Sequence, residues 1–372
     1  MVGPKDSPVW DIAPHTSAKH QIMRKYLGGW FPKLGMGTYS SGRVIFLDGF
    51  AGPGVYSDGT EGSPTIALRE LMNHPSKHAI TRKSEVVFIF NEKDKKRYRI
   101  LEEQLVNLEA EYGGWGNNVR VHAVDASFDE LVDELLDGIE GTGKKLAPTF
   151  AFVDPFGYKD VSIEKLARLL RYEKCELFIY FDFNSVQRFA TAGNVDEAFN
   201  RLYGTGEFKQ APATGDPDRP RFLLELYERQ LRDVVGFPYV QAFRMVNMQG
   251  KTNNYMIFCS RHLDGLDLMK KAMWSVSPTG DFKFEDRMAG QDILVGLDQP
   301  DLEPLAARLL AHFAGRTVPF AEVDRFVLTE TPYHRGHLKQ KTLGPMRKAK
   351  QLSTDSPSRG FPETCRITFV ES

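Results

Sequence analysis

Hydrophobic residues in this chain gather in short runs separated by amphipathic stretches, the pattern of strands that alternate with helices. Five mostly apolar runs of strand length lie at residues 44–47, 85–92, 119–125, 149–153 and 175–183. Strands that alternate with helices pair in parallel and are covered on both faces. The pattern therefore predicts an α/β protein built on a parallel sheet.

Two further strands are expected at residues 239–248 and 254–260, around a turn at residues 249–251. They predict an antiparallel hairpin, which makes a seven-stranded mixed sheet with helices on both faces. Residues 184–235 are expected to form a mostly helical insertion. Residues 16–34 predict an amphipathic N-terminal helix, and we expect its basic residues to lie on a solvated face. These are Lys19, Arg24 and Lys25.

The C-terminal part has a different pattern. Helices are expected at residues 302–313, 320–328 and 335–351, the last broken near Gly344-Pro345, followed by a strand at residues 364–370. This order predicts a small winged-helix domain. We therefore expect two domains, residues 1–300 and residues 301–372.

The composition narrows the classes of protein. The chain has 48 basic and 49 acidic residues, which excludes a role as a bulk polyelectrolyte. Its three cysteines are far apart, so neither a metal site nor a disulfide framework is expected. No apolar run reaches the length of about 18 residues that spans a membrane. We expect a soluble, cytoplasmic protein with no membrane partner.

The first predicted strand ends in an acid and a glycine-rich turn, Asp48-Gly-Phe-Ala-Gly-Pro-Gly54. Ala51 departs from the G-x-G-x-x-G of nicotinamide binders, and no Gly-Lys-Ser/Thr of a P-loop follows. The turn resembles the D-x-F-x-G-x-G turn of class I S-adenosylmethionine (SAM) methyltransferases. A glycine turn that serves only strand-to-helix packing is the alternative.

Acids also end the second and third predicted strands, at Glu92 and Asp125. A carboxylate at the end of strand two can accept both ribose hydroxyls of a nucleoside cofactor. By the same resemblance, the acid after strand three would meet the adenine amine. The predicted cofactor is therefore SAM, held by Asp48, Gly49, Phe50, Gly52, Gly54, Glu92 and Asp125.

The fourth predicted strand is followed by Asp154-Pro155-Phe156-Gly157. The place resembles that of Asp/Asn-Pro-Pro-Tyr/Phe in amino-methyltransferases, although Phe replaces the second Pro and Gly replaces the aromatic residue. The resemblance implies that Asp154, Pro155 and Phe156 are catalytic, and a simple helix-initiating turn is the alternative. Asn184 and Arg188, beyond strand five, are candidates for gripping the acceptor.

The C-terminal tail carries a local excess of basic residues, which bears on what this domain contacts. Residues 331–354 hold six basic residues and no acidic one. The basic third helix of a winged helix can lie in a DNA groove. A packing or protein-contact domain is the alternative. The candidate nucleic-acid contacts are Arg335, Lys339, Lys341, Arg347 and Lys348.

Nearly the whole chain resembles the three-Cys-motif partner proteins of bacteria and phages. The resemblance rests on residues 47–56, 62–64 and 153–158, with further matches around Trp30, Arg188 and Trp274. It implies a class I methyltransferase with a C-terminal helix-turn-helix, and an iron–sulfur radical-SAM-like partner. We expect SAM-dependent methylation of nitrogen or oxygen on a nucleic acid or nucleobase-containing acceptor. A small-molecule or peptide methyltransferase, or a SAM-binding partner protein without catalysis, remains open.

Overall fold

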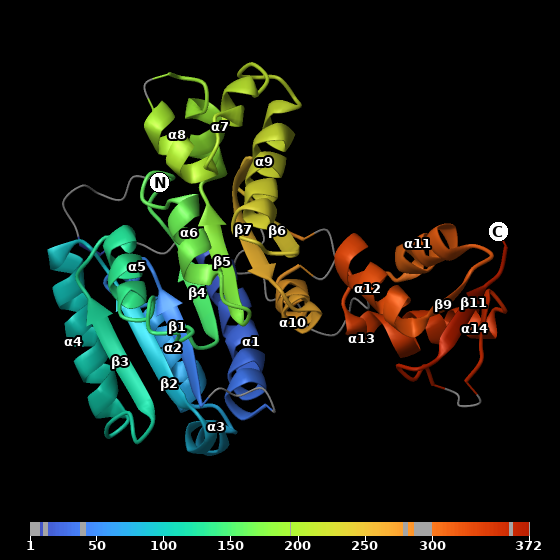
Figure 1. Cartoon of the computed structure of the whole chain (residues 1–372), viewed down its shortest axis with the longest axis horizontal. Coiled ribbons are helices and arrows are strands. Elements are labelled where there is room, and N and C mark those ends of the chain that lie inside the picture. The colour runs from blue at the N-terminus through green and yellow to red at the C-terminus, as the bar shows by residue number, and fades with distance from the viewer. Residues whose placement is uncertain are drawn as a thin grey trace. The chain divides into compact units, whose positions relative to one another are not determined.

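The computed structural model describes residues 8–9, 14–37, 42–193, 195–277, 282–285, 300–356 and 360–371. The chain divides into two compact units, which the colours of Figure 1 help to follow. The first comprises Met1–Arg261 with Phe284–Ala289, and the second comprises His262–Lys283 with Gly290–Ser372.

The first unit is built on a sheet with the strand order β3-β2-β1-β4-β5-β7-β6-β8. Strands β1 to β5 pair in parallel, whereas β7 is antiparallel to both β5 and β6. This confirms the predicted α/β class I methyltransferase fold with its terminal hairpin. The strands are β1 (Arg43–Asp48), β2 (Glu85–Asn91), β3 (Val119–Val124), β4 (Thr149–Val153), β5 (Cys175–Phe181), β6 (Tyr239–Val246), β7 (Thr252–Ser260) and β8 (Lys283–Glu285).

The predicted count of seven strands is wrong, because β8 adds an eighth beside β6. This strand has only three residues, Lys283–Glu285. Three residues are too few to show the alternation that identifies a strand. Its pairing depends on the exposed edge of β6, which is a tertiary feature.

Nine α-helices of the described residues accompany this sheet, and three of them lie within residues 183–233. They are α1 (Pro14–Met36), α2 (Ser63–Met72), α3 (Lys77–Lys83), α4 (Lys95–Glu111), α5 (Phe128–Asp137), α6 (Ile163–Leu170), α7 (Phe183–Phe189), α8 (Asp196–Tyr203) and α9 (Arg219–Asp233). None of the helices described is long and apolar enough to cross a membrane.

The two faces of the sheet differ in chemistry. Side chains alternate between faces along a strand. Ile45 and Leu47 of β1 belong to a hydrophobic core that is mainly aliphatic around β1 and β4 and includes residues of α5 and α6. Phe46, on the opposite face, meets Phe88 and Phe150 in an aromatic layer whose members lie about 6.0 Å apart between ring centroids. Helix α1 covers this aromatic face.

The same alternation decides where the strand-end acids point. On the aromatic face, β1, β2 and β4 carry Phe46, Phe90 and Phe152 near their ends. Two residues beyond each of these phenylalanines, and therefore at the next position of the same face, the chain has an acid. These acids are Asp48, Glu92 and Asp154. The alternation therefore places the three carboxylates on the face that α1 covers.

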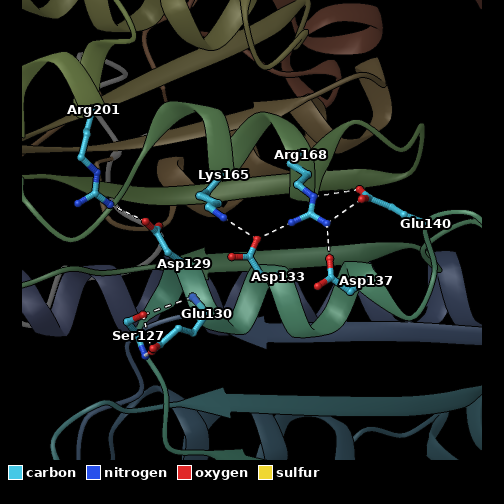
Figure 2. Close-up of polar contacts among 9 residues, drawn as sticks. All are labelled: Ser127, Asp129, Glu130, Asp133, Asp137, Glu140, Lys165, Arg168 and Arg201. Carbon is cyan, nitrogen blue, oxygen red and sulfur yellow. Dashed lines mark hydrogen bonds and ion pairs between the residues drawn. The ribbon is translucent and has the colours of Figure 1, made fainter.

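Surface ion pairs connect helices on the aliphatic side (Figure 2). Arg168 of α6 contacts Asp137 at 2.6 Å and Glu140 at 2.7 Å, and it also pairs with Asp133 of α5. Arg201 of α8 reaches Asp129 of α5 at 2.5 Å. Exposed pairs contribute little individually, but a network fixes geometry. It ties α5, α6 and α8 together beside the loop that follows β4.

Helix α1 is anchored on the aromatic face by a buried hydrogen bond. The Tyr26 hydroxyl donates to Glu176 of β5 at 2.5 Å, and the Ser260 hydroxyl donates to the other carboxylate oxygen at 2.8 Å. The Tyr26 ring stacks on Phe150, with centroids 5.0 Å apart. Because Glu176 is buried, these donors are needed to offset its loss of water.

Replacing Tyr26 by Phe should lower the free energy of unfolding by about 1–3 kcal/mol, because a buried acceptor loses a donor. Chemical denaturation followed by circular dichroism measures the change. Tyr98→Phe is the matched control, since it removes an exposed bond to Glu102 of 2.9 Å. The control should change stability by less than about 0.5 kcal/mol. Equal losses in the two variants would contradict an anchoring role for Tyr26.

The second unit confirms the predicted winged-helix order. Its three-stranded sheet has the order β10-β11-β9. The third predicted helix begins at Arg335 but has a π-helical turn, Lys339–Leu343, directly before Gly344. Residues 357–359 of the expected wing lie outside the described residues. The elements are α10 (Leu263–Trp274), α11 (Glu303–Phe313), β9 (Thr317–Pro319), α12 (Phe320–Glu330), α13 (Arg335–Leu338), α14 (Gly344–Lys348), β10 (Leu352–Thr354) and β11 (Arg366–Phe369).

Helix α10 precedes residue 300 and yet packs within this second unit. The Trp274 indole N–H donates to the carbonyl of Pro332 at 2.8 Å, and its ring lies 4.5 Å from that of His337. The buried Lys270 ammonium donates to the carbonyl of Thr331. Burial lowers the pKa of Lys270 to about 7. The helix is therefore an integral part of the unit's core.

Candidate active site at the carboxyl edge of the sheet

The strand order reverses at β1, which pairs with β2 on one side and with β4 on the other. In open α/β sheets such a switch point opens a crevice at the carboxyl ends of the strands. Asp48 is the last residue of β1, and Asp154 follows the last residue of β4. The topology therefore brings these two predicted site residues to one place.

Asp48 is fully buried at this edge. One carboxylate oxygen accepts a 2.6 Å hydrogen bond from the Ser63 hydroxyl, and the other accepts from the backbone N–H of Phe50 at 3.1 Å. Burial raises the pKa of Asp48 to about 7, even though both donors and Lys19 lower it. Asp48 therefore changes charge near neutral pH.

The glycine turn is held on both sides. The Gly49 N–H donates to the carbonyl of Phe152 in β4 at 2.9 Å, and the Ala51 N–H donates to that of Asn91 in β2 at 2.8 Å. Gly52 has φ of +62°, a left-handed conformation that favours glycine. Backbone atoms thus line the space in front of β1 without a Cβ at this point.

Glu92 follows β2 and is also buried. Its carboxylate accepts from the Asp94 N–H at 2.7 Å and from the backbone of Gly52. Burial is the main cause that raises the pKa of Glu92, and these backbone donors oppose it. The side chain therefore links the end of β2 to the glycine turn.

Asp125 lies beyond β3 and is exposed. It contributes to the raised pKa of Tyr98 on α4, for which burial is the largest cause. Phe50 of the glycine turn stacks on Phe128 of α5, with ring centroids 5.6 Å apart. Asp125 thus stands at the outer end of the edge, and Asp48 and Glu92 stand at its buried centre.

Asp154 has a partner that the sequence interpretation missed. The ammonium of Lys19 in α1 forms an ion pair with its Oδ2 atom. Lys19 is only 5% exposed, so the prediction that it lies on a solvated face is wrong, whereas Arg24 and Lys25 are exposed as expected. Lys19 lies two helical turns before Tyr26, on the same face of α1. This spacing is the signal in the sequence that could have revealed it.

Two exposed aromatic side chains lie in the segments that follow β4 and β5. Phe156 is 56% exposed and Phe189 is 37% exposed. Tyr158 is buried beneath them, with its ring centroid 6.5 Å from that of Phe189. We call the two exposed residues, Phe156 and Phe189, the aromatic rim. Cations lie over the rim: Arg97 is 4.9 Å from the Phe156 ring and Arg188 is 5.2 Å from the Phe189 ring.

The other predicted residues near the rim occupy different positions. Pro155 is buried in the loop after β4, and Asn184 is partly exposed on α7. A 2.6 Å ion pair between Lys93 and Asp160 joins the loops after β2 and β4. The pair thus links the loops that follow the two neighbours of β1.

The first unit has two open hollows of about 290 and 220 Å³, and Gly54 of the glycine turn lines the second. They share Glu61 and Arg69, and residues of α2 and α4 contribute to their walls. Neither is lined by the strand-end acids. The convergent polar groups at the strand ends, rather than the size of a hollow, define the candidate site.

The predicted nucleic-acid residues of the second unit fall into two groups. Arg335 is held inside the unit, at 2.9 Å from Asp324 and paired with Asp264, and Lys339 pairs with Glu363 at 2.9 Å. Lys341 and Lys348 are exposed, and Arg347 is partly exposed. The structure therefore brings the last three to the surface and uses Arg335 to hold α10, α12 and α13 together.

Comparison with known proteins identifies the C-terminal part. Residues 283–359 match the family model of the GMT-like wHTH domain. This part of the chain is thus a winged helix-turn-helix domain. No curated protein sequence matches the chain.

Three solved structures are similar to parts of the chain. A candidate transferase from Pyrococcus horikoshii, PH0793, is 12% identical with a TM-score of 0.29, over 65% of this chain and 62% of its own. A DUF574 family protein from Streptomyces avermitilis is 11% identical with a TM-score of 0.29, over 65% of this chain and 83% of its own. PKMT2 from Rickettsia typhi, in complex with AdoHcy, is 11% identical with a TM-score of 0.26, over 66% of this chain and 55% of its own. Likenesses this distant carry no conclusion about activity.

The raised pKa of Asp48 predicts a dependence of stability on pH. The pKa of this carboxyl is about 7 in the folded protein and about 3.9 in the unfolded chain. Its contribution to the free energy of unfolding is therefore complete below pH about 4. This stability is lost as the pH rises to about 7, at about 1.4 kcal/mol per unit.

The free energy of unfolding of the wild type should therefore fall, relative to that of Asp48→Asn, as the pH rises from about 4 to about 7. Thermal unfolding across this range measures it. Asp233→Asn, at an exposed position of α9, is the control and should run parallel to the wild type. Parallel curves for Asp48→Asn as well would exclude a buried titration at Asp48.

Proposed function

We propose that this protein is a SAM-dependent methyltransferase that acts on nitrogen or oxygen of a nucleic acid or nucleobase-containing acceptor. One observation carries the proposal. Asp48 ends β1, Glu92 and Asp154 directly follow the neighbouring strands β2 and β4, and the backbone of the glycine turn is hydrogen-bonded to both of these strands. Such an arrangement suits an elongated nucleoside cofactor that bears both a charged end and a ribose.

The residues present fit the charges of SAM. Asp48 and the glycine turn would hold its amino-acid end, Glu92 would accept the ribose hydroxyls, and Asp125 would meet the adenine amine. The buried Oδ1 of Asn91, beside the turn, has no hydrogen-bond partner among the described residues. A buried polar atom of this kind is normally satisfied, so it supports a ligand here. When bound, SAM supplies a methyl group on a sulfonium, which becomes a neutral thioether as the acceptor is methylated.

Asp154 would orient the acceptor. Its carboxylate stands at the switch point with a side chain that is 23% exposed, so a substrate can reach it. The carboxylate and the carbonyl of Pro155 would accept hydrogen bonds from an acceptor N–H or O–H, whose proton passes to Asp154 and then to water. General-base assistance of this kind is worth about 10²–10⁴-fold. Alignment of the acceptor contributes further.

The aromatic rim favours an acceptor that carries a base. Unpaired bases stack on aromatic rings, and neighbouring arginines attract phosphates. Phe156 and Phe189 are exposed, and each has an arginine over its ring. This combination favours a nucleotide over a peptide side chain.

We also propose that the protein acts in the cytoplasm as a partner of a three-Cys-motif protein. The proposal rests on the resemblance of residues 47–56, 62–64 and 153–158 to that family. Among these, the Asp48 turn and the Asp154 loop both contribute to the candidate site. The winged helix would contact either the nucleic acid or this partner.

Glu92→Gln should weaken binding of S-adenosylhomocysteine about tenfold or more. The variant keeps an acceptor for the backbone N–H groups and loses the charge, and a charged hydrogen bond is worth about 1.5–3 kcal/mol. Calorimetric titration measures the dissociation constant. Glu109→Gln, at an exposed position of the adjacent α4, is the control and should bind like the wild type. A wild type that binds neither SAM nor its product would refute the proposed cofactor.

Replacing Lys341, Arg347 and Lys348 together by Ala should weaken nucleic-acid binding and flatten its salt dependence. For duplex DNA, the slope of log K against log salt should decrease by about 0.9 for each phosphate that the variant no longer neutralises. Fluorescence anisotropy with labelled duplex and single strands, at several salt concentrations, measures the slope.

The control for this triple variant removes three exposed charges of the first unit, Lys144, Lys145 and Arg221. It should keep the wild-type slope. If the wild type binds no DNA or RNA at low salt, the winged helix is a protein-contact domain instead.

A further inference from the structure

The side chain of one lysine is buried beside the candidate active site, where burial of its charge is not expected to increase the free energy of unfolding. Lys19 is 5% exposed, and its ammonium pairs with Asp154, which is 135 residues away in the chain. Taking an ammonium out of water costs several kcal/mol, and a buried ion pair often stabilises no better than apolar residues of similar volume. A pair of this kind in the centre of a site therefore calls for a role other than stability.

The surroundings of Lys19 limit what the ammonium can do. It lies 5.2 Å from the centroid of the Tyr180 ring and next to the buried His20. Burial, followed by the charges of Lys19 and Arg24, lowers the pKa of His20 to about 3, so this imidazole is neutral. Asp154 is the carboxylate that the ammonium contacts directly.

The ion pair also separates two acids that would otherwise repel each other. The charges of Asp154 and Lys19 act on Asp48 in opposite directions, the first raising its pKa and the second lowering it. The three groups thus share one neighbourhood at the switch point. Without the ammonium, Asp154 would be free to rotate away from the buried Asp48.

Helix α1 determines where the ammonium stands. Tyr26, seven residues after Lys19, is fixed to Glu176 in the first half of β5, and Lys19 lies over Tyr180 in the second half. Seven residues advance a helix by about 10.5 Å, which is close to the roughly 13 Å between residues four apart on a strand. Helix α1 therefore runs antiparallel to β5, and its anchor holds Lys19 at the carboxyl edge.

We propose that Lys19 is a positioning residue for methyl transfer: its ammonium holds Oδ2 of Asp154 and thereby directs Oδ1 toward the methyl acceptor. This inference rests on the proposed function, because it assigns Asp154 the task of orienting the acceptor. Lys19 itself contacts neither the acceptor nor the cofactor. The role predicts an effect on turnover rather than on cofactor affinity.

The test compares Lys19→Met and Lys19→Arg with Lys25→Met, which removes an exposed lysine from the same helix. Transfer of labelled methyl from SAM to total RNA and to heat-denatured DNA gives kcat, and calorimetry gives the affinity for S-adenosylhomocysteine. We expect Lys19→Met to lower kcat about 10²-fold, the effect of misplacing a catalytic group by about 1 Å. Lys19→Arg should recover part of this loss. Affinity for S-adenosylhomocysteine should stay within about threefold of the wild type in all three variants, a change of less than about 0.7 kcal/mol.

Two results of this comparison would overturn the inference. A kcat of Lys19→Met equal to that of Lys25→Met would show that Asp154 needs no partner. A large loss of S-adenosylhomocysteine affinity would assign Lys19 to the cofactor instead. A wild type that binds no S-adenosylhomocysteine would defeat the proposed function itself, which the affinity measurement shows separately.

If the wild type binds S-adenosylhomocysteine but methylates neither acceptor pool, a stability measurement tests whether the Lys19–Asp154 pair serves positioning. The double variant Lys19→Met with Asp154→Leu removes both charges at once. Its midpoint of thermal unfolding should equal or exceed that of the wild type if the pair serves positioning. A clearly lower midpoint would show that the pair is structural and would overturn the inference.

Discussion

The first unit depends on one constraint: carboxylates shielded from water must find hydrogen-bond donors within the protein. The ion pair between Lys19 and Asp154 is one result of it. Helix α1 covers the aromatic face of the sheet and excludes water from acids that the strand register places on this face. Asp48, Glu92 and Glu176 are all buried there. Each must therefore be satisfied by donors of the protein. The hydroxyls of Ser63, Tyr26 and Ser260 and the backbone of the glycine turn supply these donors. The Lys19 ammonium does the same for the partly exposed Asp154.

The difference between the two faces of the sheet explains how a rigid scaffold and a polar site share the same strands. The aliphatic face packs against α5 and α6, where surface ion pairs complete the contact. The aromatic face packs against α1 and ends in carboxylates at one edge. Asp48, Glu92 and Asp154 thus lie at the strand ends near the point where the strand order reverses, whereas Glu176 is satisfied within the core by Tyr26 and Ser260. The raised pKa of Asp48 follows from this placement.

The second unit shows that a basic sequence is not in itself a basic surface. Arg335 is the first basic residue of the predicted recognition helix, yet its guanidinium is held by Asp324 and Asp264. Asp264 lies in α10, so this arginine ties a helix outside the usual winged-helix elements to the unit. The basic side chains at the surface lie further along, where Lys341 and Lys348 are exposed and Arg347 is partly exposed.

The sequence by itself determined the features that depend on neighbours in the chain. The alternation of strands and helices predicted the parallel sheet, and the turn after Asp48 and the acids Glu92 and Asp154 were found because local chemistry follows each strand. The eighth strand, the burial of Lys19 and the engagement of Arg335 were decided by tertiary structure. Each depends on how one element is rotated against another that is distant in the chain. Periodicity shows that a helix has an apolar face, but only packing decides which charged residue at its border is covered, and by what.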